Sequence, residues 1–148
     1  EGKTLHPELF STAFSQDEMC IICSPNDGLS MQRPLSFNDF AESQWLLREP
    51  GSGSREFFLK TVAPHIEHWH EAFELNTTEA LINGVAAGLG YACLSKLAAH
   101  AALNDGRVTL LPISIEMKRQ FWLLVHKEKY QSPLLKRFIE FCLKHQKT

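Results

Sequence analysis

The segment LREPGSGSR at residues 47–55 decides the fold class, because it joins an apolar run to a helix through a turn of glycine and serine. The apolar run makes residues 44–49 a predicted strand, which Pro50 and Gly51 end. A helix is predicted over residues 54–62, with Pro64 marking its end. A strand that leads through a short turn into a helix is the repeating unit of α/β proteins.

The same kind of unit recurs on both sides of this segment. Apolar runs and alternating patterns predict further strands at residues 8–14, 19–23, 72–75, 90–94, 108–111 and 120–126. Helical spacing predicts helices at residues 37–42, 77–88, 96–104 and 134–144. Alternating elements of this length indicate a mainly parallel α/β sheet that places ligands at the carboxyl ends of its strands.

Two of the predicted helices have distinct faces. In the helix predicted at residues 77–88, Asn76 is the expected N-cap, and the Glu79 side chain is expected to complete a capping box with it. The predicted inward face of this helix consists of Leu81, Val85 and Leu89. A stripe of small residues, which would let another element approach closely, consists of Ala80, Gly84 and Gly88. The predicted inward face of the last helix consists of Leu134, Phe138, Phe141 and Cys142.

Composition limits the class of protein. The 148 residues are 44% hydrophobic, which suits one globular domain. Fifteen basic and seventeen acidic residues give a formal charge of −2, the wrong sign for a surface that grips DNA unaided. The four cysteines are spread over a chain that can fold without disulfides, so we expect a reducing compartment, the cytoplasm. The sequence contains no charged-then-apolar leader and no long apolar run, so neither a signal peptide nor a membrane contact is expected.

The turn at residues 50–55 is a candidate anion site. Ser52, Gly53 and Ser54 place free backbone N–H groups and hydroxyls at a helix start, where the helix dipole favours negative charge. Arg55 could add a forked pair of donors. The alternative is that Ser52 or Ser54 merely caps the helix, and the sequence leaves both interpretations open.

Thr77 and Thr78 repeat this arrangement at the start of the next helix, after a second strand. Two helix N-termini could therefore point into one cleft. The alternative is again a simple cap.

Other candidate sites are weaker. Cys20 and Cys23 are three apart on a predicted strand, so they should face opposite sides and not share a metal or a disulfide. A solvated cluster is the preferred interpretation of the histidines His65, His68 and His70. We therefore expect no metal site.

Motifs of catalysis and nucleotide binding are absent from the sequence. It contains no Gly-x-Ser-x-Gly elbow, no P-loop and no dinucleotide fingerprint. The tryptophans are not interleaved with basic residues, which argues against a stacking surface for single-stranded nucleic acid. We expect neither an enzyme nor a cofactor.

Three segments in register resemble LysR-type effector-binding domains: WLLREPGSGSR at residues 45–55, NTTEA at 76–80 and VAAGLGY at 85–91. The ending, from LLVHK at 123–127 through SPL at 132–134 to Phe138 and Phe141, is also similar to that family's last strand and helix. The resemblance covers essentially the whole chain.

The resemblance implies an α/β, two-lobed periplasmic-binding-protein-like (type II) fold with an incomplete first lobe. The effector-binding domain would span residues 1–148, with 1–20 and 121–148 in the first lobe and 21–120 in the second. Strands near residues 17–22 and 120–125 would cross between the lobes. The family's N-terminal winged helix-turn-helix and the start of the first lobe do not appear, so the chain is expected to be a piece of a longer protein.

The function implied is that of the ligand-sensing domain of a bacterial LysR-type transcription factor. A small anionic effector, either a carboxylate or an oxyanion, would sit between the lobes without a cofactor. Its expected contacts are Ser52, Gly53, Ser54, Arg55, Thr77 and Thr78. The full-length protein would be a homodimer or homotetramer, pairing through segments near 54–62 and 70–75, and would contact DNA only through the missing N-terminal domain. The alternative is a solute-binding protein of a transport system, which shares this fold.

Overall fold

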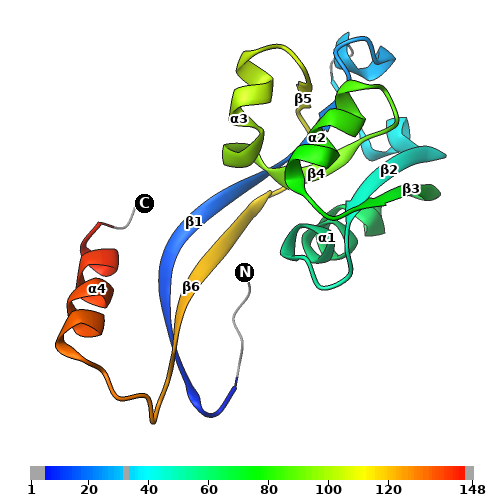
Figure 1. Cartoon of the computed structure of the whole chain (residues 1–148). Coiled ribbons are helices and arrows are strands. Elements are labelled where there is room, and N and C mark those ends of the chain that lie inside the picture. The colour runs from blue at the N-terminus through cyan, green and yellow to red at the C-terminus, as the bar shows by residue number, and fades with distance from the viewer. Residues whose placement is uncertain (1–5, 32–33, 146–148) are drawn as a thin grey trace. The chain divides into compact units, whose positions relative to one another are not determined.

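The computed structural model describes residues 6–31 and 34–145 and divides the chain into two units (Figure 1). Unit 1 consists of Glu1–Asp17 and Lys118–Thr148, and unit 2 of Glu18–Met117. The first and last residues of the expected domain, and so part of its expected first lobe, lie outside the described residues. The assignment of the two units to the expected lobes remains a prediction.

The strand β1, Leu9–Cys23, is continuous where the sequence predicted two strands at residues 8–14 and 19–23. The polar residues between those segments interrupt the apolar pattern but not the backbone pairing. β1 pairs there with β6, Lys118–His126, and the two strands run side by side in Figure 1. The Gln120 side chain also donates from Nε2 to the Ser15 carbonyl at 2.7 Å. The prediction of a break was wrong because backbone pairing does not require apolar side chains.

Unit 2 contains strands of the sheet built on β1 and a separate two-stranded sheet, which an isolated bridge joins into one layer. β4, Ala92–Ser95, and β5, Thr109–Leu111, each pair antiparallel with β1. β2, Ser43–Arg48, and β3, Trp69–Leu75, pair in parallel, and Tyr91 joins β2 to the start of β4 through a parallel bridge. The layer therefore combines antiparallel and parallel pairs, and the prediction of a mainly parallel sheet was wrong because side-chain alternation carries no information about strand direction.

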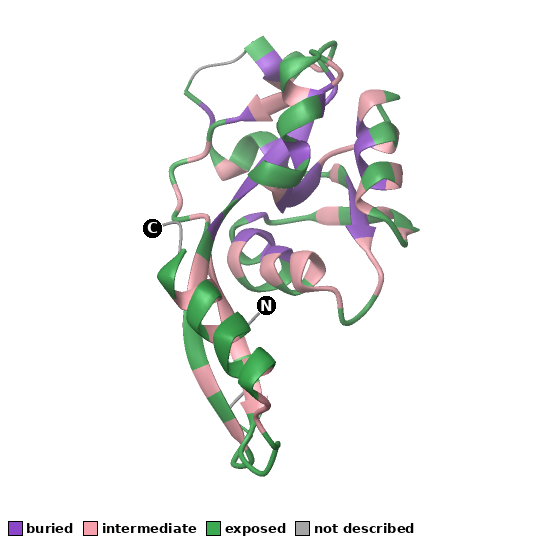
Figure 2. Ribbon diagram, turned by 60° about the vertical axis from the view of Figure 1, so that its left-hand side comes forward, coloured by how far each residue is buried: buried purple, intermediate pink, exposed green. Residues whose placement is uncertain are grey.

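Alternation along the strands builds a core on each face of this layer. On β1, Met19, Ile21 and Cys23 belong to one core, and Cys20 and Ile22 belong to the other. The buried residues, purple in Figure 2, are concentrated in unit 2. The chain thus forms an α/β layer structure, in which strands with two buried faces need helices on both sides.

The first core is covered by short helices. These are η2 (Phe37–Phe40), α1 (Gly53–Phe57), the π-helical turn η3 (Phe58–Val62) and η4 (Ala63–His65), and a further short helix, η1 (Gly28–Met31), lies earlier in the chain. Trp45 at its centre is fully buried, and Phe58 lies against it with ring centroids 4.5 Å apart. The predicted helix at 54–62 is therefore present but changes from α to π geometry after Phe57.

The second core is covered by α2, Thr78–Ala86, and α3, Lys96–Asn104. Gly84 faces β2 so closely that a Cβ there would lie 2.9 Å from the Leu46 Cδ1 atom, which confirms the close approach predicted for this residue. The prediction was wrong for Gly88, which lies beyond the end of α2 and has no neighbour within 4 Å of an added Cβ. Leu81 and Val85 are buried as predicted, but Leu89 is 47% exposed. Leu89 lies beyond the end of α2, after the chain has turned at Gly88 with a φ of 79°.

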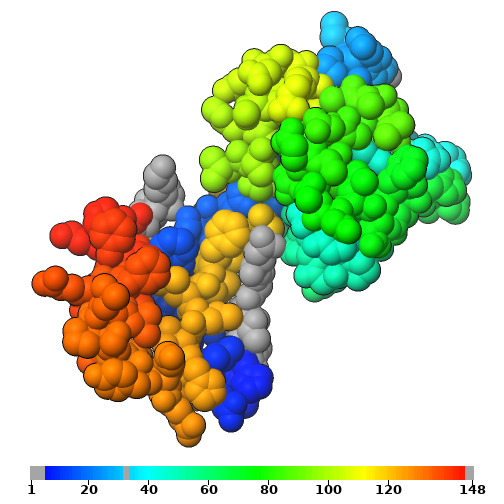
Figure 3. Space-filling view, in the orientation of Figure 1, coloured from blue at the N-terminus to red at the C-terminus, as the bar shows by residue number. Residues whose placement is uncertain are grey.

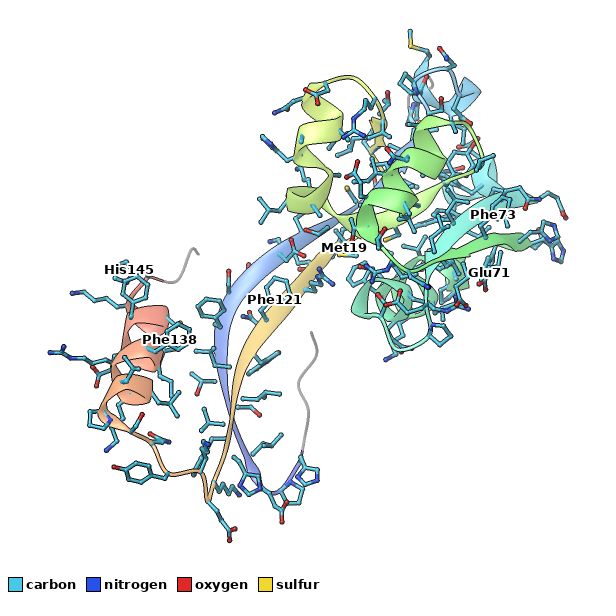
Figure 4. All side chains as sticks on the ribbon, in the orientation of Figure 1. Met19, Glu71, Phe73, Phe121, Phe138 and His145 are labelled. Atoms are coloured by element: carbon cyan, nitrogen blue, oxygen red, sulfur yellow. The ribbon has the colours of Figure 1, made fainter. Side chains whose placement is uncertain are left out.

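The last helix, α4 at Pro133–Lys144, is amphipathic, but its apolar face is open. Leu134, Phe138 and Phe141 are 79%, 59% and 60% exposed, and Phe138 is labelled in Figure 4. The prediction that they face inward was wrong for the described residues, in which no element covers this face. Cys142 is partly buried. No helix within residues 6–31 and 34–145 combines the length and apolarity that a membrane span needs.

Candidate functional site

A tight turn carries the chain from β2 into α1. The Ser52 N–H donates to the Glu49 carbonyl at 3.1 Å, and Gly51 between them has a φ of 87°. Proline followed by a residue with positive φ is the pattern of a type II turn, for which glycine is the least strained choice. The Glu56 N–H then donates to the Ser52 carbonyl at 3.0 Å, which starts the helix.

The residues at this helix start are half-buried. Ser52 occupies the N-cap, but its side chain makes no capping hydrogen bond, so the simple-cap interpretation lacks its characteristic contact. Gly53 and Ser54 are the first residues of α1. Their position at a helix start agrees with the sequence prediction, and their role in ligand binding remains a proposal.

Arg55 is held within the chain. Its Nη1 donates to the Arg48 carbonyl at 2.9 Å, and Nη1 and Nη2 donate to the two carboxylate oxygens of Glu71 at 2.9 and 2.8 Å. Glu71 is on β3 and is labelled in Figure 4, and Glu74 lies 3.7 Å from the same guanidinium. The Glu71 hydrogen bonds are the largest of the influences that raise the pKa of Arg55. Arg55 thus ties α1 to the last residue of β2 and to Glu71 within β3.

Arg48 is a further candidate, which was not among the contacts expected from the sequence. Its Nε and Nη2 donate to the two carboxylate oxygens of Glu49 at 2.8 and 2.9 Å, and its Nη1 donates to the Thr78 hydroxyl at 3.1 Å. The Arg48 hydrogen bonds are the main reason that the pKa of the Glu49 carboxyl is lowered. Arg48 therefore links the end of β2 to the start of α2.

The alternation of β2 could have identified Arg48. Leu46 belongs to the core under α2, whereas Trp45 and Leu47 belong to the opposite core. Because residues two apart on a strand share a face, Arg48 points to the side of Leu46 and hence toward α2.

The two threonines at the start of α2 have different partners. Thr77 is the N-cap, and its hydroxyl accepts the Ala80 N–H at 3.1 Å, so the simple-cap interpretation is confirmed for this contact. The predicted cap at Asn76, with its Glu79 capping box, was wrong by one residue. Thr78 is the first residue of the helix, and its hydroxyl accepts from Arg48.

Both helix starts lie at the same edge of the sheet. β2 and β3 are parallel, and Arg48 pairs in register with Leu75, so the strands end side by side. α1 follows the end of β2 and α2 follows the end of β3. In the space-filling view the green surface of α2 adjoins the blue-green surface of α1 (Figure 3). Backbone N–H groups and two arginines thus gather at an edge where an anion could bind.

The remaining candidates do not assemble into a site. Cys20 and Cys23 face opposite cores, as predicted, and neither forms a disulfide. His65 stacks on Phe37 with ring centroids 4.8 Å apart, and His70 contacts the Glu42 carboxylate at 2.9 Å. Within the described part of the chain, no three histidine, cysteine or acidic side chains are placed to hold a metal ion.

The chain matches a known family and a curated relative. A family model described as the LysR substrate binding domain matches residues 1–147. The HTH-type transcriptional regulator YeiE of Escherichia coli, itself described as uncharacterized, is 30% identical over 143 residues, which are 96% of this chain and 48% of that protein. The chain therefore spans about half the length of such relatives.

Two solved structures share the fold. The regulatory domain of CcmR from Synechocystis PCC6803, in complex with 2-PG, aligns with a TM-score of 0.81 and 18% identity over 99% of this chain and 73% of that one. The effector-binding domain of QuiR, in complex with shikimate, aligns with a TM-score of 0.81 and 19% identity over 97% of this chain and 68% of that one. These likenesses show the α/β, type II periplasmic-binding-protein-like fold that the sequence predicted.

Proposed function

The chain belongs to the LysR substrate-binding-domain family, and on this premise we propose that it senses a small anionic effector for a bacterial transcriptional regulator. The effector-binding character follows from the family, and the anionic character is our inference from the site. The observation that supports it best is the shared sheet edge where α1 and α2 both begin and where Arg48 meets Thr78.

Each proposed contact has a defined role. Ser52, Gly53 and Ser54 offer backbone N–H groups and hydroxyls at the start of α1, and Thr78 offers the same at the start of α2. Thr77 and Arg55 contribute mainly by holding these residues in place. Thr77 caps the start of α2, and Arg55 fixes α1 through its hydrogen bonds to Glu71. Arg55 could bind the effector directly only by exchanging a Glu71 hydrogen bond for a ligand oxygen.

The ligands of similar domains support an anion. The CcmR domain was solved with 2-PG and the QuiR domain with shikimate. Shikimate is a carboxylate, a group that helix N-termini and arginine side chains both bind well. We propose the same ligand chemistry for this chain.

The proposed mechanism of the full regulator follows the family resemblance. The effector would bind between two lobes and favour one state of closure, since a ligand with equal affinity for both states shifts nothing. The regulator would act as a homodimer or homotetramer and contact DNA through an N-terminal domain. These steps remain predictions about the longer protein.

The alternative of a transport solute-binding protein is not favoured, because the relatives that match the chain are transcriptional regulators. The same relatives are regulators rather than enzymes.

A thermal-shift screen against small carboxylates and inorganic oxyanions tests the proposal. A specific ligand at a hundredfold excess over its Kd adds about 2.7 kcal/mol of stability, which raises Tm by several degrees. The shift should shrink in Ser52→Ala and Thr78→Val and persist in Glu67→Gln, whose His68 contact lies at the exposed surface. If no anion raises Tm, or if both site variants respond like the wild type, the proposed anion site is wrong.

A further inference from the structure

The Arg48 guanidinium already binds a carboxylate, that of the neighbouring Glu49. Nε and Nη2 each donate to a different oxygen of this carboxylate, at 2.8 and 2.9 Å. Two parallel hydrogen bonds between planar groups are the strongest and most shape-selective mode of carboxylate recognition by arginine. The third donor, Nη1, anchors the guanidinium to Thr78 at 3.1 Å.

The two partners differ in how firmly they are held. The Arg48 side chain is 21% exposed and is attached to both β2 and α2, whereas the Glu49 side chain is 38% exposed and belongs to the turn that follows β2. An ion pair with one partner at the surface contributes little net stability, because water can replace the contact. The Glu49 carboxylate can therefore leave Arg48 at small cost.

Arg55 offers no such exchange. Its side chain is 16% exposed and lies between Glu71 and Glu74, and it also supports the Arg48 carbonyl. Releasing Glu71 would detach α1 from β3. Arg48 is thus the arginine at this edge whose carboxylate partner can be replaced without separating two elements.

The charge at this edge also favours an exchange. Arg48 and Arg55 face the three carboxylates of Glu49, Glu71 and Glu74. With all of them ionised the group has an excess of negative charge, which opposes a further anion. An entering anion is accommodated when one carboxylate moves into water, and Glu49 is the one placed to do so.

We propose that Glu49 is a displaceable internal counter-ion of Arg48, and that the effector's carboxylate replaces it on Arg48 beside the Thr78 hydroxyl. This inference rests on the proposed function and makes it more specific. The effector is a carboxylate rather than a tetrahedral oxyanion, because the Arg48 fork is already arranged around a planar two-oxygen group. Glu49 then sets the affinity, since each effector must compete with it.

Arginine NMR tests the counter-ion directly. The Arg48 Nε–H signal, assigned by its loss in Arg48→Lys, is followed during titration of the 148-residue chain with sodium acetate and with sodium sulfate. In Glu49→Gln, which keeps the shape of the side chain but removes its charge, acetate should shift this signal at about fivefold lower concentration than in the wild type. Sulfate should be weaker than acetate. Glu74→Gln, a matched loss of one carboxylate at the same edge, should change the acetate midpoint less.

The outcomes separate this inference from the proposed function. If the Arg48 signal of Glu49→Gln does not respond to acetate, or responds equally in the wild type, the counter-ion role is wrong even where an effector binds elsewhere. If Glu49→Gln responds but the wild-type chain binds no anion in the thermal screen, the counter-ion stands and the sensing function is wrong. The variant Arg48→Lys keeps the positive charge but loses the forked pair of donors. If this variant still prefers effector carboxylates over sulfate in the thermal screen, the assignment of the effector as a carboxylate is wrong.

Discussion

Arg119 on β6 and Asp17 on β1 form a buried ion pair within unit 1. The Nε and Nη2 atoms of Arg119 both lie 2.7 Å from the Oδ2 atom of Asp17, and the two side chains are 12% and 6% exposed. The guanidinium also lies 5.0 Å from the ring centroid of Phe121, which is labelled in Figure 4. Asp17 and Arg119 stand beside the points where the chain passes between the two units.

Breaking this ion pair should destabilise the chain strongly. Asp17→Asn removes the negative charge and leaves the Arg119 charge buried, which costs about 3 kcal/mol. Urea unfolding measures the loss. Glu18→Gln is the matched control, because the adjacent Glu18 pairs with Lys96 at 3.0 Å between side chains that are 58% and 47% exposed. The control should change stability by less than about 0.5 kcal/mol, and equal losses in both variants would contradict the account.

Gly90 should not tolerate a side chain. It has a φ of 149°, and a Cβ there would lie 2.5 Å from the Gln44 carbonyl oxygen, which accepts the Tyr91 N–H. Gly90→Ala should therefore separate β2 from the start of β4 and cost about 3 kcal/mol or more. Gly28→Ala, where no atom lies within 4 Å of the new Cβ, is the control and should unfold close to the wild-type urea midpoint. If Gly90→Ala lowers the stability only slightly, the contact between Gly90 and the Gln44 carbonyl is not tight.

The N-cap of α2 should be Thr77 and not its neighbour. Thr77→Ala removes the hydroxyl that accepts the Ala80 N–H and should cost about 1 kcal/mol, whereas Thr77→Ser should retain most of the stability. Asn76→Ala serves as the comparison, because the structure places Asn76 outside the cap. A larger loss in Asn76→Ala than in Thr77→Ala, measured by chemical denaturation, would restore the cap that the sequence suggested.

Two acidic side chains should make stability depend on pH in the acid range. The pKa of Glu42 is lowered mainly by its hydrogen bond with His70, and that of Glu49 by its hydrogen bonds with Arg48. A carboxyl whose pKa is lowered by folding contributes its full stability above the unfolded value of 4.5 and loses it as pH falls through the folded value. The double variant Glu42→Gln/Glu49→Gln should therefore show a smaller fall in Tm below pH 4.5 than the wild type. Parallel curves of Tm against pH would contradict this assignment.

Local signals made parts of the fold predictable. The helix expected at 96–104 is observed as Lys96–Asn104, because the Ser95 cap and the turn at Gly106, with a φ of 69°, mark both ends. The strand expected at 44–49 is observed as Ser43–Arg48, because Pro50 and Gly51 end the apolar run. Strand direction, the continuity of β1 and the open face of α4 depend on partners distant in sequence, which periodicity does not identify.

The position of the candidate site could be predicted from the sequence, but the hydrogen-bond partners of its arginines could not. The turn rich in glycine and serine does start a helix beside the start of α2, as the spacing suggested. Arg55 was the expected ligand contact because it follows the turn, but its guanidinium donates to Glu71, and Arg48 donates to Thr78 instead. Two arginines at one turn can be told apart only when the register between β2 and β3 is known.

The most direct test of the central claim, that this chain senses a small anion at the shared edge of β2 and β3, is backbone-amide NMR during titration with a carboxylate that raises Tm. The account predicts that the largest saturable shifts occur at Gly53, Ser54 and Thr78 and are lost in Thr78→Val. Saturable shifts confined to other parts of the chain, or no shifts with any carboxylate tested, would contradict it.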